Sequence, residues 1–211
     1  MAMDLVDWFT ERLALPLPGW KVQARYQPEL SFGRHFVPPP PAARRAAVLV
    51  LLQPQADSWT VPLTLRPAEL LDHAGQMSLP GGLIEPNERS EDAARRELLE
   101  ELGAIPADLV LLGRLSPIYL FNSNFAVEPW LAATRSRTPW APNVAEVAEL
   151  IEAPLDELCH PDNSIVWQRE FNGVTARVPG IVCARHRIWG ATCMILAELI
   201  ALVEEYRKHR L

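Results

Sequence analysis

Residues 82–104 read GLIEPNERSEDAARRELLEELGA, a glycine turn followed by a charged helix. Residues three and four apart in an α-helix share a face, so Glu97, Glu100 and Glu101 fall within an arc of about 100°. Three clustered carboxylates repel one another unless a cation joins them, and their hard oxygens suit Mg²⁺ or Mn²⁺. An acidic face exposed to solvent is the more common explanation of such a run, so the helix alone leaves both interpretations open.

The other side of this helix predicts how it packs. Ala94, Leu98 and Leu102 recur at helical spacing and form an apolar stripe that is expected to face the core. Ser90 is the expected N-cap, because its hydroxyl can accept from a free amide of the first turn. Gly103 is the expected C-terminal stop, since glycine adopts the left-handed conformation that ends many helices.

The segment resembles the signature of the Nudix hydrolases, which runs Gly, five residues, Glu, seven residues, Arg-Glu, an aliphatic residue, any residue, Glu-Glu, any residue, Gly and an aliphatic residue. The residues in register are Gly82, Glu88, Arg96, Glu97, Leu98, Glu100, Glu101 and Gly103. Ala104 departs from the pattern, because a larger aliphatic residue is usual there. The resemblance implies an α/β fold of the Nudix type, an α/β/α sandwich with a mixed central sheet. It also implies that Arg96 and Glu88 position the helix and the turn.

The same resemblance implies a site and a reaction. Glu97, Glu100 and Glu101 become ligands of Mg²⁺ or Mn²⁺, and Arg96, Glu100 and Glu101 belong to the catalytic group. The reaction is attack by a metal-activated water on one phosphorus of a diphosphate. The general base is Glu100, Glu101 or a downstream loop acid, and Glu146 stands where many Nudix proteins carry a loop glutamate. A solvated turn residue is the alternative interpretation of Glu146.

The preceding stretch, PLTLRPAELLDHAGQMSLPGG at residues 62–82, resembles an additional signature of the coenzyme A pyrophosphatase branch. The matching residues are Leu63, Thr64, Arg66, His73, Gly75, Gln76, Pro80, Gly81 and Gly82. The positions that differ are Pro62, Pro67, Leu71 and Leu79. Residues 188–200, IWGATCMILAELI, are also similar to that branch. The resemblance implies hydrolysis of coenzyme A or an acyl-CoA to 3′,5′-ADP and (acyl-)4′-phosphopantetheine.

The candidate substrate contacts in this stretch are Arg66, His73, Gln76, Gly81 and Gly82. Arg66 is either a phosphate contact or a strand-end ion pair. His73 and Gln76 are also compatible with structural roles in the loop. Leu71 replaces an arginine of the branch, which removes a charge-assisted donor and leaves the coenzyme A specificity open.

Two other functions stay open on the sequence. One is a Nudix pyrophosphohydrolase for another substrate, such as ADP-ribose, a dinucleotide or a nucleoside triphosphate. The other is a nucleotide-binding module of this fold without catalysis, which the presence of all the signature glutamates argues against.

Composition bounds the class of protein. The chain has 211 residues, of which 49% are hydrophobic and 22% charged, as expected for a globular domain. Prolines gather at Pro16, Pro18 and residues 38–41. We therefore expect an N-terminal helix and proline-rich arm over residues 1–41 and a Nudix domain over residues 42–211.

Charge and cysteine content restrict the partners. A net charge of −6 argues against nucleic acid as a partner, because binding to its backbone requires a basic surface. The three cysteines are odd in number and lack metal-ligand spacing, which favours a reducing compartment. No signal peptide and no membrane span is expected. The prediction is a cytoplasmic monomer or homodimer that acts on a small nucleotide substrate.

Hydrophobic periodicity predicts the remaining elements. The expected strands are residues 46–52, 59–66, 109–115, 126–133 and 146–151, with a hairpin of 165–171 and 175–178. The expected helices, apart from the one already described, are residues 4–14, a short one ending near 159, and 189–208. Pro62 predicts an edge or a bulge, since proline cannot donate to a ladder. Trp189 is expected in the core rather than as a platform that stacks on substrate.

Overall fold

The computed structural model of the chain describes residues 4–56, 58–68 and 75–210, so His73 and Leu71 lie outside the described residues. The helices are α1 Leu5–Arg12, α2 Trp20–Gln23, α3 Ser90–Leu102, α4 Leu155–Cys159 and α5 Gly190–His209. Single 3₁₀ turns lie at Ala24–Tyr26, Glu29–Ser31, Arg34–Phe36 and Pro161–Asn163. The strands are β1 Arg44–Gln55, β2 Ser58–Leu65, β3 Met77–Ser78, β4 Gly81–Leu83, β5 Val110–Arg114, β6 Ile118–Leu120, β7 Phe125–Ala133, β8 Glu149–Pro154, β9 Ser164–Phe171, β10 Val174–Cys183 and β11 His186–Trp189.

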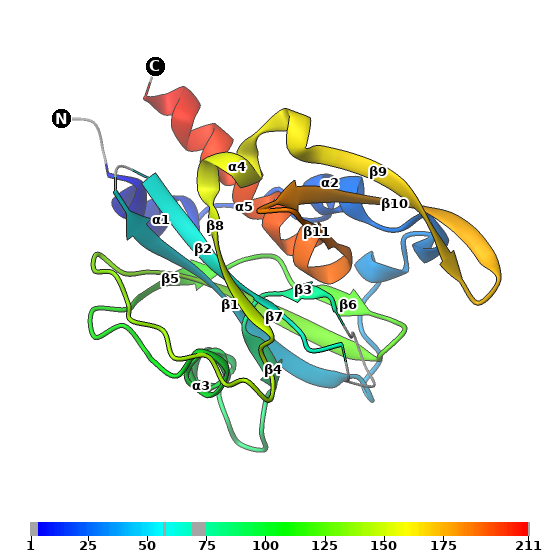
Figure 1. Ribbon diagram of the computed structural model, residues 1–211, viewed down its shortest axis with the longest axis horizontal. Helices are drawn as coiled ribbons and strands as arrows, with labels where there is room; N and C mark the ends of the chain where they lie inside the picture. Colours follow the sequence, from blue (N-terminus) through cyan, green and yellow to red (C-terminus); the bar gives the residue numbers. More distant parts are fainter. Residues whose placement is uncertain (1–3, 57, 69–74, 211) are drawn as a thin grey trace.

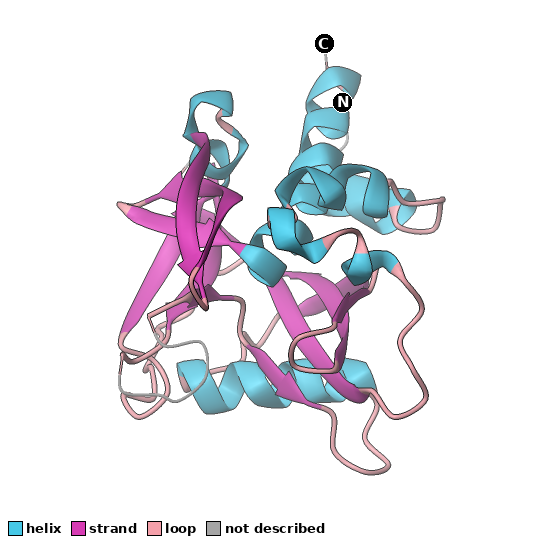
Figure 2. Ribbon diagram, turned by 90° about the vertical axis from the view of Figure 1, so that its right-hand side faces the viewer, coloured by secondary structure: helices cyan, strands magenta, loops and turns pink. Residues whose placement is uncertain are grey.

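The main sheet is mixed. β1 runs parallel to β7, and both strands also have antiparallel neighbours, β2 and β4 beside β1 and β5 and β6 beside β7. β2 in turn pairs with β3 and β8. Helix α3 lies below the sheet, whereas α1, α2 and α5 lie above it (Figures 1 and 2). The predicted α/β/α sandwich with a mixed central sheet is therefore confirmed.

Alternation along β1 explains why the sheet has helices on both faces. Leu49 and Leu51 are fully buried in the hydrophobic cluster that contains Leu98 and Leu102 of α3. The intervening Val50 and its neighbours on the other face belong to the cluster formed by α1 and α5. Because successive side chains of a strand point to opposite faces, one apolar run supplies both cores. The predicted core-facing stripe of α3 is confirmed.

Several elements follow their sequence signals. Asn172 and Gly173 form the turn between β9 and β10 with φ of 50° and 79°, as expected for a tight hairpin. Pro62 pairs with Glu152 of β8 on one side of β2. On the other side, β2 pairs with β1 only over residues 58–60 and with β3 only over residues 64–65, so Pro62 has no strand partner there among the described residues. The missing N–H of a proline is tolerated at such a gap.

The structure corrects other expectations. Helix α3 has Arg89 as its N-cap, and Ser90 lies inside the helix, where its hydroxyl accepts from Trp130 Nε1 at 3.1 Å. The proline-rich arm expected up to residue 41 contains α2 and three 3₁₀ turns, and no strand among its described residues. β8 begins at Glu149, so Glu146 lies in the turn before it. No helix in the described part of the chain is long and apolar enough to cross a membrane.

A buried carboxylate joins the two ends of the chain. Glu198 of α5 is 0% exposed. It accepts from the backbone N–H of Gly19 at 2.7 Å and from the N–H and hydroxyl of Ser116 at 2.7 and 2.8 Å. Hydrogen bonds of this kind are what makes a buried charged group tolerable. Through them α5 holds both the N-terminal segment and the connection from β5 to β6.

Candidate active site

The glycine turn is shaped by close backbone contacts. β4 pairs antiparallel with β1, so that Gly81 lies opposite Val48 and Gly82 opposite Ala47. A β-carbon on Gly81 would lie 2.4 Å from the carbonyl oxygen of Ala47. A β-carbon on Gly82 would lie 2.4 Å from Oε1 of Glu97. Glycine at these positions therefore allows the turn to meet the sheet on one side and a helix carboxylate on the other.

Arg96 ties this turn to α3. Its Nε and Nη2 donate to the two carboxylate oxygens of Glu88 at 2.9 and 3.1 Å, and Nη2 also donates to the carbonyl of Leu83 at 2.8 Å. Its Nη1 donates to Glu97 at 2.8 Å and to Glu100 at 3.0 Å. The hydrogen bond to Glu88 is the largest cause of a raised pKa for Arg96. One guanidinium thus fixes the turn and pairs with two of the three helix glutamates.

The three glutamates differ in environment, although the helix pattern predicts a common face. Glu100 is exposed, with half of its side chain accessible, and Glu97 is half-buried. Glu101 is only 4% exposed. Burial raises the pKa of Glu97, and the ion pair with Arg96 opposes that rise. A solvated acidic face, the alternative interpretation of this run, does not describe Glu101, because β2 and the glycine turn cover it.

Glu101 lies inside a small polar network. It accepts from the backbone N–H of Gly81 at 3.3 Å and from the hydroxyl of Thr64 at 3.4 Å. Burial raises the pKa of Glu101 to about 7; the hydrogen bond from Gly81 and the charge of Arg66 oppose the rise, while the charge of Glu97 adds to it. Thr64 belongs to the second signature, but the sequence pattern assigns no role to its hydroxyl. Only the tertiary contact between β2 and α3 reveals that role.

The loop that carries Glu146 is attached to the end of α3. The N–H groups of Ala141 and Asn143 donate to the carbonyls of Leu102 and Glu101 at 2.9 and 2.8 Å. The exposed carboxylate of Glu146 accepts from Asn143 Nδ2 at 3.1 Å. Its negative charge contributes to the raised pKa of Glu97 and of Glu101. The structure therefore brings this distant glutamate within electrostatic reach of the helix carboxylates.

Arg66 follows directly after β2, and its positive charge acts on Glu101. Its backbone N–H donates to Gln76 at 3.1 Å, and its carbonyl accepts from Gly75 at 3.1 Å. Its side-chain Nε is buried and has no hydrogen-bond partner in the described part of the chain. The positive charge lowers the pKa of Glu101. Arg66 thus offers a donor beside the glutamates, whereas His73 of the same predicted group lies outside the described residues.

The donor set fits a hard divalent cation. Carboxylate oxygens are the ligands that Mg²⁺ and Mn²⁺ prefer, and Gly82 leaves open the space that the Glu97 carboxylate uses. Like charge from Glu97 and Glu146 acts on the buried Glu101, a repulsion that a cation would relieve. Within the described ranges no three acidic, histidine or cysteine side chains are gathered in metal-binding geometry, and Arg96 forms ion pairs with Glu97 and Glu100. Binding of a cation would therefore replace contacts of Arg96.

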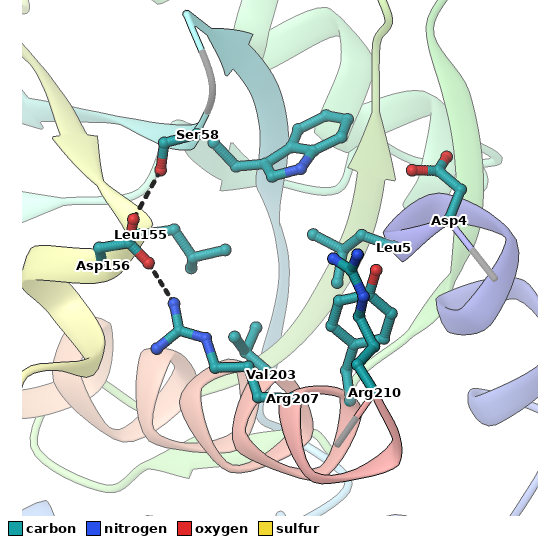
Figure 3. Close-up of a pocket in the computed structure, with 10 residues that line it drawn as sticks. Asp4, Leu5, Ser58, Leu155, Asp156, Val203, Arg207 and Arg210 are labelled. Carbon is teal, nitrogen blue, oxygen red and sulfur yellow. Dashed lines mark hydrogen bonds and ion pairs between the residues drawn. The ribbon is translucent and has the colours of Figure 1, made fainter. Parts of the chain in front are cut away.

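A separate cavity of about 190 Å³ lies at the opposite end of the molecule from the glycine turn, between α1, α4 and α5. Asp156 accepts there from Ser58 at 2.9 Å and pairs with Arg207, while Leu5 lines the other side (Figure 3). None of the predicted site residues lines this cavity. The ion pair between Asp156 and Arg207 forms one side of this cavity, and the glutamates of α3 remain the candidate reaction site.

Comparisons with known proteins agree with the geometry. The sequence model of the NUDIX domain matches residues 43–172. A protein of Pectobacterium atrosepticum called an uncharacterized Nudix hydrolase NudL is 34% identical over 147 residues, 69% of this chain and 76% of that protein. A protein of the same name from Yersinia pestis is 37% identical over 142 residues, 66% of this chain and 70% of the other. The crystal structure of a MutT/nudix family protein from Enterococcus faecalis has a TM-score of 0.56 at 18% identity, covering 83% of this chain and 68% of that one, which is a likeness of fold.

Proposed function

Because the chain belongs to the Nudix hydrolase family and is a pyrophosphohydrolase of diphosphate substrates, we propose that its substrate is coenzyme A or an acyl-CoA. Hydrolysis of the diphosphate would yield 3′,5′-ADP and (acyl-)4′-phosphopantetheine. Support comes from the second signature, residues 62–82, which resembles that of the coenzyme A pyrophosphatase branch.

The observation that carries the proposal is the contact between this second signature and the glutamate helix. Thr64 and Gly81 both donate to the carboxylate of Glu101, and the charge of Arg66 lowers its pKa. Residues that resemble a substrate-specific motif therefore touch the predicted metal ligand itself. A guanidinium whose buried Nε has no hydrogen-bond partner among the described residues suits a substrate phosphate, which would accept from that Nε.

In this mechanism Glu97, Glu100 and Glu101 would hold Mg²⁺ or Mn²⁺, which would lower the pKa of a water molecule and neutralise charge on the diphosphate oxygens. Arg96 fixes the relative position of turn and helix. Of the three candidate bases, Glu100 is paired with Arg96 and Glu101 is buried. Glu146 is exposed and has no cationic partner among the described residues, so we assign it the role of accepting the proton of the attacking water.

One departure from the coenzyme A signature supports a second class of substrate. Leu71 replaces an arginine of the coenzyme A branch, and no apolar side chain can replace a charge-assisted donor. ADP-ribose, a dinucleotide or a nucleoside triphosphate is therefore the alternative substrate. A cytoplasmic location is part of the proposal and is supported by Cys159, Cys183 and Cys193, which are free and buried.

A substrate panel tests the proposal. Coenzyme A, an acyl-CoA, NADH, ADP-ribose and dGTP are incubated with the purified protein and Mg²⁺ or Mn²⁺, and products are separated by chromatography. We expect coenzyme A or the acyl-CoA to have the highest kcat/KM and to release 3′,5′-ADP. Rapid cleavage of ADP-ribose without loss of coenzyme A would overturn the assignment and favour the alternative. The Glu101→Gln variant controls for contaminating phosphatases.

A further inference from the structure

Aromatic and arginine side chains share one face of the three-stranded sheet β9–β10–β11. Trp167 and Arg169 lie two residues apart on β9, and Arg187 and Trp189 lie two residues apart on β11. Trp189 is paired with Gly180 of β10, and Trp167 with the residue two positions before it. Directly paired residues, and residues two apart on a strand, point to the same face. The four side chains therefore stand together.

The two arginines cross this face in opposite directions. The guanidinium carbon of Arg169 lies 4.5 Å from the ring centre of Trp189, so the side chain reaches from β9 to β11. The guanidinium carbon of Arg187 lies 5.3 Å from the ring of Trp167, so this side chain reaches from β11 to β9. Two strand spacings separate the two outer strands, about 10 Å in all. Both guanidinium groups are thus held on neighbouring indole rings over the middle of one small sheet.

Glycine at the centre makes room for this arrangement. A β-carbon on Gly180 would lie 2.9 Å from the indole of Trp167, so the ring leans over the glycine backbone. Trp189, expected in the core, is half-buried and carries Arg169 on its ring. The structure thus corrects that expectation.

The charge of this face is uncompensated. Neither Arg169 nor Arg187 forms an ion pair with a carboxylate in the described part of the chain. Glu170 pairs with Thr175 and so belongs to the opposite face. An arginine is always charged, and stacking on an indole holds its planar fork of N–H donors in place. Two such forks, neither of them ion-paired among the described residues, are complementary to a phosphate group.

The sheet that carries this face adjoins the segment that leads into the glycine turn. β11 packs beside β3, as Figure 1 also shows. Thr192, three residues after Trp189, donates its hydroxyl to the carbonyl of Met77 in β3 at 3.0 Å. From Met77 the chain reaches Gly81 in four residues, a span of at most about 14 Å. A nucleotide whose diphosphate lies at the glycine turn can therefore extend toward this sheet.

We propose that Arg169 and Arg187 bind the 3′-phosphate of coenzyme A, a phosphate monoester separate from the diphosphate that is cleaved. This inference rests on the proposed function. Coenzyme A carries this doubly charged group, whereas dephospho-coenzyme A, NADH and ADP-ribose lack it. The arginine pair would supply positive charge to the substrate outside the metal site, and so discriminate coenzyme A from other nucleoside diphosphates.

Kinetics on a substrate pair test the inference. kcat/KM is measured for coenzyme A and dephospho-coenzyme A with the wild-type protein, Arg169→Gln, Arg187→Gln and the double variant. We expect each single substitution to lower the ratio of the two kcat/KM values about tenfold, through KM for coenzyme A, as for the loss of one charge-assisted contact. Arg177→Gln is the matched control, because Arg177 is exposed on the opposite face of β10. It should leave the ratio unchanged.

A binding measurement separates this inference from the proposed function. Calorimetry without divalent metal compares the affinities of 3′,5′-ADP and 5′-AMP for the wild-type protein and for the two single variants, Arg169→Gln and Arg187→Gln. We expect tighter binding of 3′,5′-ADP to the wild type and loss of that difference in both variants. Coenzyme A hydrolysis with an unaltered substrate ratio in both variants would overturn the inference and leave the function intact. Failure to cleave coenzyme A would overturn the function, and equal binding of 3′,5′-ADP by all proteins would overturn the phosphate site independently.

Discussion

Gly82 and Glu97 share one small space, since a β-carbon on residue 82 would lie 2.4 Å from Oε1 of Glu97. Gly81 faces backbone instead, with the carbonyl of Ala47 at 2.4 Å and the α-carbon of Val48 at 2.6 Å from the same imagined atom. The far end of a glutamate side chain can move, but a strand backbone cannot. The two adjacent glycines therefore serve different purposes.

Substitution of these glycines should separate activity from stability. In Gly82→Ala the new methyl group displaces the Glu97 carboxylate, so we expect kcat/KM to fall on the order of a hundredfold with little change in melting temperature. In Gly81→Ala the methyl group collides with β1, so we expect a loss of about 2 kcal/mol in unfolding free energy and a melting temperature lower by roughly 4–8 °C. Thermal unfolding and steady-state kinetics on both variants check this. A Gly82→Ala protein as unstable as Gly81→Ala would contradict it.

Glu100→Gln and Glu101→Gln should each lower turnover by more than about a hundredfold, because a neutral amide binds divalent cations far less strongly than a carboxylate. The fold should survive in both cases. Glu100 is exposed, and a glutamine at position 101 keeps the shape of the buried side chain and an oxygen for the N–H of Gly81. Circular dichroism controls for folding. More than a tenth of wild-type turnover in both variants would refute the ligand assignment.

The ion pair between Arg96 and Glu88 should contribute to stability independently of catalysis. Both nitrogens of the contact donate to one carboxylate at 2.9 and 3.1 Å, a geometry that makes an ion pair stronger than average. A double-mutant cycle with Arg96→Gln and Glu88→Gln should show a coupling of about 1 kcal/mol in unfolding free energy. Arg89 and Glu91 form the control pair, since the side chain of Arg89 is 76% exposed and free to move. A coupling energy of equal size in the control pair would show that the bidentate geometry adds no stability beyond that of an exposed ion pair.

His35 predicts a loss of stability in acid. Burial lowers the pKa of His35 below its ordinary value of 6.5, although the hydrogen bond to the carbonyl of Tyr119 opposes the shift. The unfolded chain therefore takes up a proton near pH 6.5 that the folded protein takes up only at lower pH. Stability from this site is complete above pH 6.5 and decreases as the pH falls below it. Urea unfolding at pH 7.5 and 5.5 should show a smaller decrease for His35→Gln than for the wild type.

The control for this measurement is His160→Gln, because the side chain of His160 is largely exposed. It should lose as much stability between the two pH values as the wild type. An equal decrease for His35→Gln and the wild type would assign the acid sensitivity to other groups.

Strong periodicity is what made parts of the fold predictable. The apolar run of β1, the stripe of α3 and the turn at Asn172 each carry a local signal that tertiary contacts reinforce. The sequence does not predict β6 and β11, because strands of three or four residues are too short to show a hydrophobic period. The N-cap of α3 was assigned wrongly because Trp130, forty residues away in sequence, binds the hydroxyl of Ser90. Local preference cannot predict such a partner.

The candidate site also has features that local spacing predicts and features that depend on tertiary contacts. Spacing places Glu97, Glu100 and Glu101 on one side of α3, but their burial depends on contacts with β2 and the glycine turn. The hydroxyl of Thr64 at Glu101 and the position of Glu146 come from segments distant in sequence. Likewise, Arg169 and Trp189 meet only because β9 and β11 flank the same strand.

The attachment of the Glu146 loop to α3 has a consequence for hydrogen exchange. The last carbonyls of a helix have no partner within it, and in α3 those of Glu101 and Leu102 accept from the amides of Asn143 and Ala141. Neither amide can exchange with deuterium until its hydrogen bond to the end of the helix opens. These two amides should therefore share one opening free energy with the amides in the last turn of α3. The loop that carries the proposed base and the helix that carries the metal ligands would then open as one cooperative unit.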